Sequence, residues 1–194
     1  MELPLNCTVD YIHPFLSKNE SDYLYNHLME RFNLNQLHSI IINGELLQYN
    51  FGKIMFIDQD LYETNKLPTA HWGRTAVWPG EMIGLKNRIE KIASLKFHTC
   101  VCIYYPDGNS GVDYHSDYPA FGDTTVIPSV SLGEERIFNL REKETMKEHS
   151  FLLENGSLII MGAHCQERYE HALPTNPIYK NGRINLTFRQ YGQN

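Results

Sequence analysis

The sequence contains few cysteines, and their spacing matches neither a zinc site nor a disulfide framework. They stand at positions 7, 100, 102 and 165 of a 194-residue chain. Small disulfide-stabilised domains and zinc fingers need more closely patterned cysteines. Cys100 and Cys102 alternate on a predicted strand, so we expect them to pack on one face as small hydrophobic side chains. This composition is typical of a reducing compartment and predicts a cytoplasmic protein, or a nuclear one if the source is eukaryotic.

Long apolar runs and an excess of basic residues are also missing. The uninterrupted apolar segments are only a few residues long, so we expect no signal peptide, transit sequence or membrane span. The 17 Lys and Arg are outnumbered by 23 Asp and Glu, which gives a net charge of −6. A protein that follows a phosphate backbone normally has a basic surface, so any contact with nucleic acid must be local.

Length and composition predict one domain that covers residues 1–194, and a monomer. A chain of this length with 42% hydrophobic residues can bury a core of its own. We interpret 1–95 as N-terminal strands, helices and a substrate lid, and 96–194 as the catalytic core.

Two helices and a hairpin are expected in the N-terminal part. Ser17 and Glu20 have the spacing of a capping box before one helix, and Pro79 precedes the second. The sequence Asn43-Gly44 between apolar segments is a strong hairpin signal. Residues 58–79 look like a loop. The apolar positions expected on the inner helix faces are Leu24, Leu28 and Phe32 in the first helix and Met82, Leu85, Ile89 and Ile92 in the second.

Eight short strands are predicted after Ser94, separated by turn signals. They cover 97–105, 111–116, 125–132, 135–141, 149–153, 157–163, 169–173 and 183–191. Eight strands at this spacing suit a double-sheet jelly roll. The fold class expected is therefore α+β, mainly β: a double-stranded β-helix (jelly roll) with N-terminal helices bracing one sheet.

His115 and Asp117 form a His-x-Asp pair on one of these strands. Side chains at i and i+2 share a face of a strand, so both can bind one metal ion from the same side. A second imidazole would complete the 2-His-1-carboxylate triad that is diagnostic of non-haem Fe(II) oxygenases. By sequence position alone the third ligand could be His149, His164 or His171.

The last predicted strand carries polar side chains on one face. Arg183, Asn185, Thr187 and Arg189 alternate with apolar residues. Four polar groups that point together into a barrel would be costly without a ligand, and two guanidinium groups suit a dicarboxylate.

These motifs together resemble the AlkB-type Fe(II)/2-oxoglutarate dioxygenases. Their signature is His-x-Asp, a distal His, and an arginine strand often written RxNLTFR, which here reads RINLTFR at 183–189. The resemblance runs from about residue 72 to 190. It implies that His171, followed by Ala172 and Leu173, is the distal ligand, and that Fe(II), 2-oxoglutarate and O2 take part in the reaction.

The resemblance also implies how 2-oxoglutarate is bound. Arg183 would pair with its distal carboxylate, while Asn185 and Arg189 would lie near the metal-bound end. Tyr105 matches the tyrosine of the family's Asn-x-Tyr motif, but Ile103 stands at the Asn position. That departure removes one polar contact, worth about 0.5–1.5 kcal/mol, so we expect weaker co-substrate binding.

For the substrate, the resemblance implies oxidative N-demethylation of alkylated nucleobases in DNA or RNA. A flipped base could stack on aromatic and His side chains, and phosphates could meet a few arginines. Repair members usually place an acidic residue after His-x-Asp, whereas Tyr118 stands here. The alternatives are a relative that acts on a small molecule or a protein side chain, and a non-catalytic jelly-roll binding module. The candidate substrate residues are His71, Trp72, Arg74, Trp78, Tyr118, Arg136 and Arg141.

Overall fold

Two antiparallel β-layers form the frame of the protein in the computed structural model, which describes residues 5–42 and 45–192. The large sheet has the strand order β1-β10-β7-β12-β5-β3-β2, and β4 pairs with β3 in parallel. The small sheet has the order β6-β11-β8-β9. The strands of the large sheet are β1 (Val9–Ile12), β2 (Leu37–Ile42), β3 (Glu45–Ile57), β4 (Thr75–Val77), β5 (Thr99–Tyr105), β7 (Ile127–Gly133), β10 (Leu158–Met161) and β12 (Arg183–Arg189). Those of the small sheet are β6 (Val112–His115), β8 (Arg136–Glu142), β9 (Glu148–Leu153) and β11 (Tyr169–Leu173).

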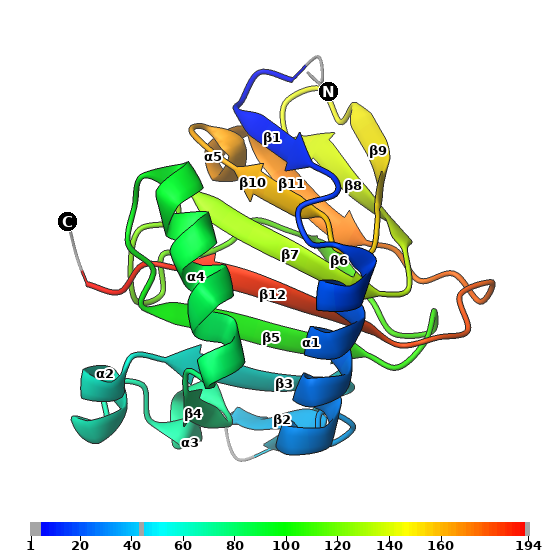
Figure 1. Ribbon diagram of the computed structural model, residues 1–194. Helices are drawn as coiled ribbons and strands as arrows, with labels where there is room; N and C mark the ends of the chain where they lie inside the picture. Colours follow the sequence, from blue (N-terminus) through cyan, green and yellow to red (C-terminus); the bar gives the residue numbers. More distant parts are fainter. Residues whose placement is uncertain (1–4, 43–44, 193–194) are drawn as a thin grey trace.

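The jelly roll is the fold expected, and its strands β5 to β12 correspond one by one to the eight predicted segments. Turn residues and alternation fix such short strands locally, so their positions could be predicted from the sequence. In Figure 1 the small sheet lies above and behind the large one.

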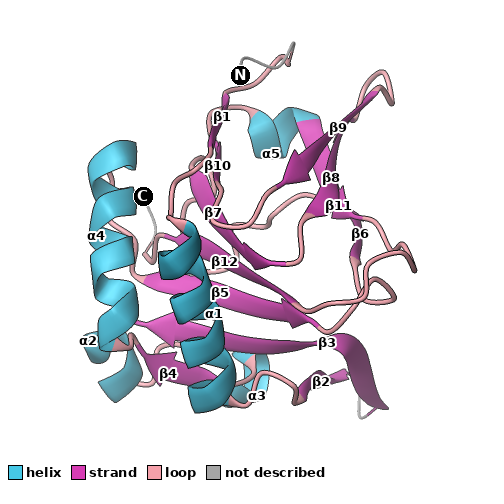
Figure 2. Cartoon of the chain, turned by 45° about the vertical axis from the view of Figure 1, so that its right-hand side comes forward, coloured by secondary structure: helices cyan, strands magenta, loops and turns pink. Residues whose placement is uncertain are grey.

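Two helices cover the outer face of the large sheet, also as expected. They are α1 (Lys18–Phe32) and α4 (Gly80–Ala93), and Figure 2 shows both on the side away from the small sheet. The capping box at Ser17 and Glu20 is present in full, with the N-cap side chain and the Glu20 carboxylate each accepting from the other's backbone N–H. The expectation for one inner residue is wrong: Ile92, in the last turn of α4, is 46% exposed.

The segment 58–79 is more ordered than the predicted loop. It contains α2 (Gln59–Glu63), α3 (Thr69–Trp72) and β4. Met55 pairs with Thr75 in the β3–β4 ladder, a contact between distant residues that local signals do not reveal. The predicted turn at residues 43–44 lies outside the described residues, but β2 and β3 flank it as an antiparallel pair. A short helix α5 (Cys165–Arg168) precedes β11.

Strand β12 separates the apolar core from the polar interior. Its even residues Ile184, Leu186 and Phe188 are fully buried on the helix side, in one cluster with Leu28 and Met82. The N-terminal part (1–95) and the C-terminal part (96–194) therefore share one core. Cys100 and Cys102 are buried in the same cluster, as expected. The odd residues of β12 face the space between the sheets, because alternate side chains of a strand point to opposite faces.

Among the helices of the described segments, we find none with both the length and the apolar character needed to cross a membrane.

Candidate metal centre

A cavity of about 140 Å³ lies between the two sheets. Its wall contains both apolar side chains and every residue predicted for the metal and the co-substrate. The members of that set are Tyr105, His115, Asp117, His171, Arg183, Asn185 and Arg189.

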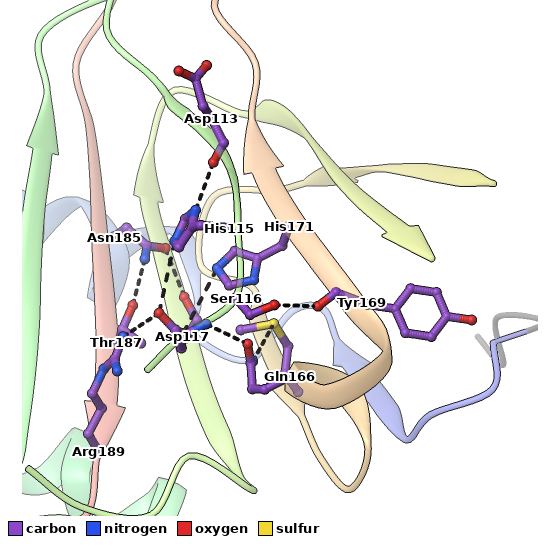
Figure 3. A network of polar contacts seen from close by, with 12 residues as sticks. Asp113, His115, Ser116, Asp117, Gln166, Tyr169, His171, Asn185, Thr187 and Arg189 are labelled. Atoms are coloured by element: carbon purple, nitrogen blue, oxygen red, sulfur yellow. Dashed lines mark hydrogen bonds and ion pairs between the residues drawn. The ribbon is translucent and has the colours of Figure 1, made fainter. Parts of the chain in front are cut away.

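Three candidate metal ligands converge at one end of this cavity (Figure 3). His115 ends β6 and Asp117 follows it, while His171 lies on the neighbouring strand β11 directly opposite His115. His115 Nε2 lies 4.0 Å from Asp117 Oδ1, and His171 Nε2 lies 3.9 Å from Asp117 Oδ2. The three ligand atoms are all within 4.8 Å of one another. This separation and this donor set suit one divalent ion bound by two imidazoles and a carboxylate.

Backbone groups and a glutamine hold these side chains in place. His115 Nδ1 lies 2.8 Å from the Asp113 carbonyl oxygen, so the hydrogen belongs on Nδ1 and Nε2 keeps its lone pair for a metal. The Asp117 backbone N–H donates to Gln166 Oε1 at 2.8 Å. Such outer contacts fix ligand orientation before the metal binds.

The charge states of the cluster also suit metal binding. Burial opposes ionisation of Asp117, but the positive charge of Arg189 and the two imidazoles outweigh it and hold the pKa of that carboxyl below its usual range. Arg189 Nη2 donates to Asp117 Oδ1 at 2.5 Å. Burial lowers the pKa of His171 to about 4. Near neutral pH the cluster therefore offers one carboxylate and a neutral His171, which are the forms that bind metals.

Arg183 is a buried cation with hydrogen-bond donors that have no partner among the described residues, which is what an anion-binding side chain requires. It is 1% exposed, and its Nη2 donates to Ser131 Oγ at 2.8 Å, whereas Nε and Nη1 are buried without a partner among the described residues. Burial lowers its pKa to about 10, so it stays charged at neutral pH. Buried donors without partners cost about 1–3 kcal/mol each. A carboxylate in the cavity would satisfy them.

Tyr105 stands opposite Arg183 in the β5–β12 ladder. Burial raises the pKa of its phenol to about 12, so the hydroxyl remains a hydrogen-bond donor. Asn185 is already partnered: it accepts from Ser129 Oγ at 2.9 Å and donates to Thr187 Oγ1 at 2.8 Å. Ile103, at the position where the family has Asn, lines the cavity with an apolar side chain.

The other two candidates for the third metal ligand, His149 and His164, do not line the metal cavity. His164 is exposed, and its Nδ1 lies 3.0 Å from Glu167 Oε2. His149 pairs with Leu140 in the β8–β9 ladder and is half-buried.

The structure corrects the expected phosphate contact of Arg136. Its side chain is 1% exposed, and it donates to the backbone carbonyls of Asp107, Ser110 and Pro174 at 3.3, 2.8 and 2.7 Å. A guanidinium buried among carbonyls holds two loops together and cannot reach a phosphate outside. Arg136 lies on β8 on the same face as the buried Phe138 and Leu140, so strand alternation places it inside the sandwich.

Arg74 and Arg141 are also engaged within the protein. Arg74 donates to the carbonyls of Phe32 and Asn33 at the end of α1, so it caps a helix instead of facing a substrate. Arg141 Nη2 donates to Glu170 Oε2 at 2.8 Å, and its guanidinium lies 3.6 Å from the centre of the Tyr114 ring. Phosphate contacts by these arginines would require breaking those interactions.

Of the two tryptophans, Trp78 belongs to the core and the expectation that it stacks on a substrate is wrong. It is 9% exposed, stacks on Phe188, and donates from Nε1 to Asp58 Oδ1 at 2.7 Å. Trp72 is half-buried against Phe121 and lines an open cleft.

His71 and Tyr118, the other aromatic substrate candidates, are exposed, Tyr118 by 82%. Neither lines the metal cavity. The prediction missed Phe51, which does line it from β3.

Comparison with known proteins agrees with this geometry. A family model described as the 2OG-Fe(II) oxygenase superfamily matches residues 8–189, which is most of the chain. The mouse alpha-ketoglutarate-dependent dioxygenase alkB homolog 3 is 34% identical over 132 residues, which cover 63% of this chain and 44% of that protein. The DNA oxidative demethylase ALKBH2 of Arabidopsis thaliana is 28% identical over 118 residues, which cover 48% of this chain and 38% of that protein. The chain thus spans less than half the length of these two relatives.

A solved structure extends the likeness to nearly the whole fold. The structure of OsALKBH1 superposes with a TM-score of 0.65 over 97% of this chain and 100% of the other, at 15% sequence identity. At that identity the match supports the jelly-roll fold.

Proposed function

The chain belongs to the 2OG-Fe(II) oxygenase superfamily, and from this premise we propose that it catalyses oxidative N-demethylation of alkylated nucleobases. The observation that carries the proposal is the convergence of His115, Asp117 and His171 in the same cavity as Arg183, whose Nε and Nη1 have no hydrogen-bond partner among the described residues. Fe(II) and 2-oxoglutarate are the cofactor and co-substrate of this family. The donor set fits the metal, and the two guanidinium nitrogens of Arg183 that lack a partner among the described residues fit a carboxylate of the co-substrate.

We assign the roles as follows. His115, Asp117 and His171 would hold the iron, and Arg183 would bind the distal carboxylate of 2-oxoglutarate through its unpartnered nitrogens. Tyr105 would donate a hydrogen bond at the same end of the cavity. Arg189 would keep the Asp117 carboxylate ionised and oriented, as its 2.5 Å contact does here.

When bound, Fe(II) with 2-oxoglutarate and O2 supplies oxidation of a C–H bond that no amino-acid side chain could attack. The chain contributes binding, orientation and exclusion of water. The apolar wall of the cavity, which includes Val101, Ile103 and Phe138, keeps competing water away from the reacting centre. A hydroxylated N-methyl group then breaks down to formaldehyde and the free amine without further help.

The nucleobase substrate is inferred from the relatives, one of which is a DNA oxidative demethylase by name. The test is succinate and formaldehyde release with Fe(II), ascorbate and 2-oxoglutarate, using methylated oligonucleotides, methylated nucleosides and a panel of small molecules. Equal release of both products, dependent on the methyl group, is expected with a methylated base. Release only with non-nucleotide substrates would overturn the proposed substrate class.

A second candidate is an oxygenase that acts on a small molecule or a protein side chain. The observation in its favour is that all three arginines expected at phosphates are engaged within the protein. It predicts that free nucleosides or small molecules turn over at least as well as oligonucleotides. A non-catalytic binding module would bind no Fe(II), Mn(II) or Ni(II) at one ion per chain, so metal analysis tests that third reading directly.

A further inference from the structure

Lys53 lies beside the metal cavity on β3, and none of the assigned roles uses it. It stands two residues after Phe51, so both side chains are on the same face of the strand. In the β3–β5 ladder Lys53 is directly opposite Ile103. Phe51 and Ile103 both line the cavity, and Figure 1 shows β5 between β3 and β12 in the large sheet. Lys53 therefore flanks the wall that faces the metal ligands.

This ammonium group is partly buried, and no counterion pairs with it among the described residues. No hydrogen bond or ion pair joins it to another side chain in the part of the chain that the structure describes. Burial lowers the pKa of Lys53, and the positive charge of Arg189 lowers it further. A cation that is desolvated next to a second cation is costly unless a ligand supplies an acceptor.

An aromatic cluster shields the same stretch of the hairpin from water. His38 stacks on Tyr49 and Phe51, with ring centres 5.2 and 6.1 Å away, and Phe51 lies 6.0 Å from Tyr105. Burial lowers the pKa of His38 to about 4, with a smaller contribution from Lys53, so His38 is neutral and cannot act as an anion or a cation there.

The charges that surround the substrate space are thus mostly positive. Of the described residues that line the cavity, Asp117 alone is a carboxylate, and Arg189 already neutralises it. Arg183 would be neutralised by the co-substrate. Among the residues that the structure describes, Lys53 then remains as the unmatched charge beside the cavity.

We propose that Lys53 makes this site selective for neutral alkylated rings that present a carbonyl oxygen, and against rings that carry a fixed positive charge. The inference rests on the proposed function and refines its substrate class. A carbonyl oxygen accepts a hydrogen bond from the ammonium, whereas a cationic ring adds like-charge repulsion in a poorly solvated space. Among methylated pyrimidines, N3-methylthymine meets this description. N3-methylcytosine, similar in size but cationic at neutral pH, does not.

These two bases provide a matched test. The iron-loaded enzyme is assayed on one oligonucleotide sequence that carries either base, and kcat/KM is measured from formaldehyde release. We expect N3-methylthymine to be preferred at least about tenfold, a factor that corresponds to roughly 1.4 kcal/mol. Lys53→Met should reduce the preference about tenfold, and Lys53→Glu should reverse it. Lys91→Met, which removes an exposed charge on α4, should leave the preference unchanged.

A binding measurement gives a readout that does not depend on turnover. Mn(II)-loaded enzyme with 2-oxoglutarate under anaerobic conditions is titrated with N3-methylthymidine and with N3-methylcytidine. Tighter binding of the neutral nucleoside, lost in Lys53→Met, supports the inference. If N3-methylcytosine had an equal or higher kcat/KM than N3-methylthymine, or bound equally or more tightly as the nucleoside, the role of Lys53 would be overturned. The demethylase proposal would remain intact. Binding and turnover of neither base would overturn the inference, and only a lack of turnover with every methylated base would remove the demethylase proposal as well.

Discussion

At the scale of single residues, the site depends on side chains that are already oriented before any ligand enters. His115 is fixed by the Asp113 carbonyl, and Asp117 by Arg189 and by Gln166 through its own backbone N–H. Orientation of this kind lowers the conformational-entropy cost of metal binding, because the ligand side chains lose little further freedom when the metal binds. His115 and His171 come from the adjacent strands β6 and β11, so the ladder between these strands sets the spacing of the two imidazoles, and Asp117 lies two residues beyond the end of β6.

Loss of one metal ligand should abolish metal binding and turnover. We expect His171→Ala to weaken Mn(II) binding by more than about 100-fold, because a triad without one protein ligand loses both affinity and geometry. Titration of the apoprotein with Mn(II), followed by electron paramagnetic resonance, measures this. His164→Ala is the matched control, since His164 is exposed and contacts Glu167. Full metal binding by His171→Ala together with its loss in His164→Ala would show that the ligand assignment is wrong.

Replacement of Arg183 should separate co-substrate binding from metal binding. Arg183→Lys keeps the charge but cannot form a two-pronged contact with a carboxylate. We expect KM for 2-oxoglutarate to rise about 10- to 100-fold while the Mn(II) dissociation constant changes less than about threefold. Steady-state kinetics with varied 2-oxoglutarate and the metal titration measure the two effects. An unchanged KM would remove Arg183 from the co-substrate site.

At the scale of secondary-structure elements, strand β3 makes contacts with several other segments at once. It is 13 residues long, pairs with β2, β4 and β5, and brings Phe51 to the cavity. Gly52 lies at its closest approach to another segment: a Cβ built there would stand 1.8 Å from the Leu34 carbonyl oxygen. The strand can pass so near the end of α1 only because that residue has no side chain.

A methyl group at this point should destabilise the protein. We expect Gly52→Ala to lower the free energy of unfolding by about 3 kcal/mol, since backbone must move to remove the clash. In a chain of this length that corresponds to a fall in Tm of roughly 6–12 °C. Gly84→Ala in α4 is the control: its Cβ would meet nothing within 4 Å, and the helix should gain about 0.5–1 kcal/mol. Thermal unfolding followed by circular dichroism distinguishes the two variants, and equal Tm values would contradict the expected clash.

At the scale of the whole molecule, the negative net charge limits how a polynucleotide can be held. The chain carries a formal charge of −6, and the arginines expected at phosphates are bound to carbonyls or to Glu170. Long-range attraction of a polyanion is therefore weak, and recognition must come from the base within the cavity.

The salt dependence of oligonucleotide use should accordingly be shallow. Each phosphate contact contributes about −0.7 to −0.9 to the slope of log affinity against log salt concentration. With at most one or two contacts, we expect a slope between 0 and about −2 for kcat/KM on a methylated oligonucleotide. Arg141→Gln should not change it, because that guanidinium is paired with Glu170. A slope steeper than about −4 would reveal a basic surface that this conformation does not present.

The sequence by itself determined the strands of the jelly roll and the His115 and Asp117 pair of the candidate metal centre, while the resemblance to a known family pointed to His171 as the third ligand. Alternation, turn residues and the His-x-Asp and RINLTFR motifs are local signals, and a strand places i and i+2 on one face wherever it lies in the fold. The capping box of α1 was equally readable, since both of its partners lie within one helical turn.

Only the tertiary structure decided which charged and aromatic residues can reach a ligand. Arg136 and Trp78 look like surface recognition residues by type, yet one is surrounded by carbonyls from two distant loops and the other stacks on Phe188. The unpaired charge of Lys53 was equally hidden, because it depends on neighbours that β5 and β12 bring to β3. Burial and pairing are set by contacts between residues far apart in the chain, and local sequence does not encode them.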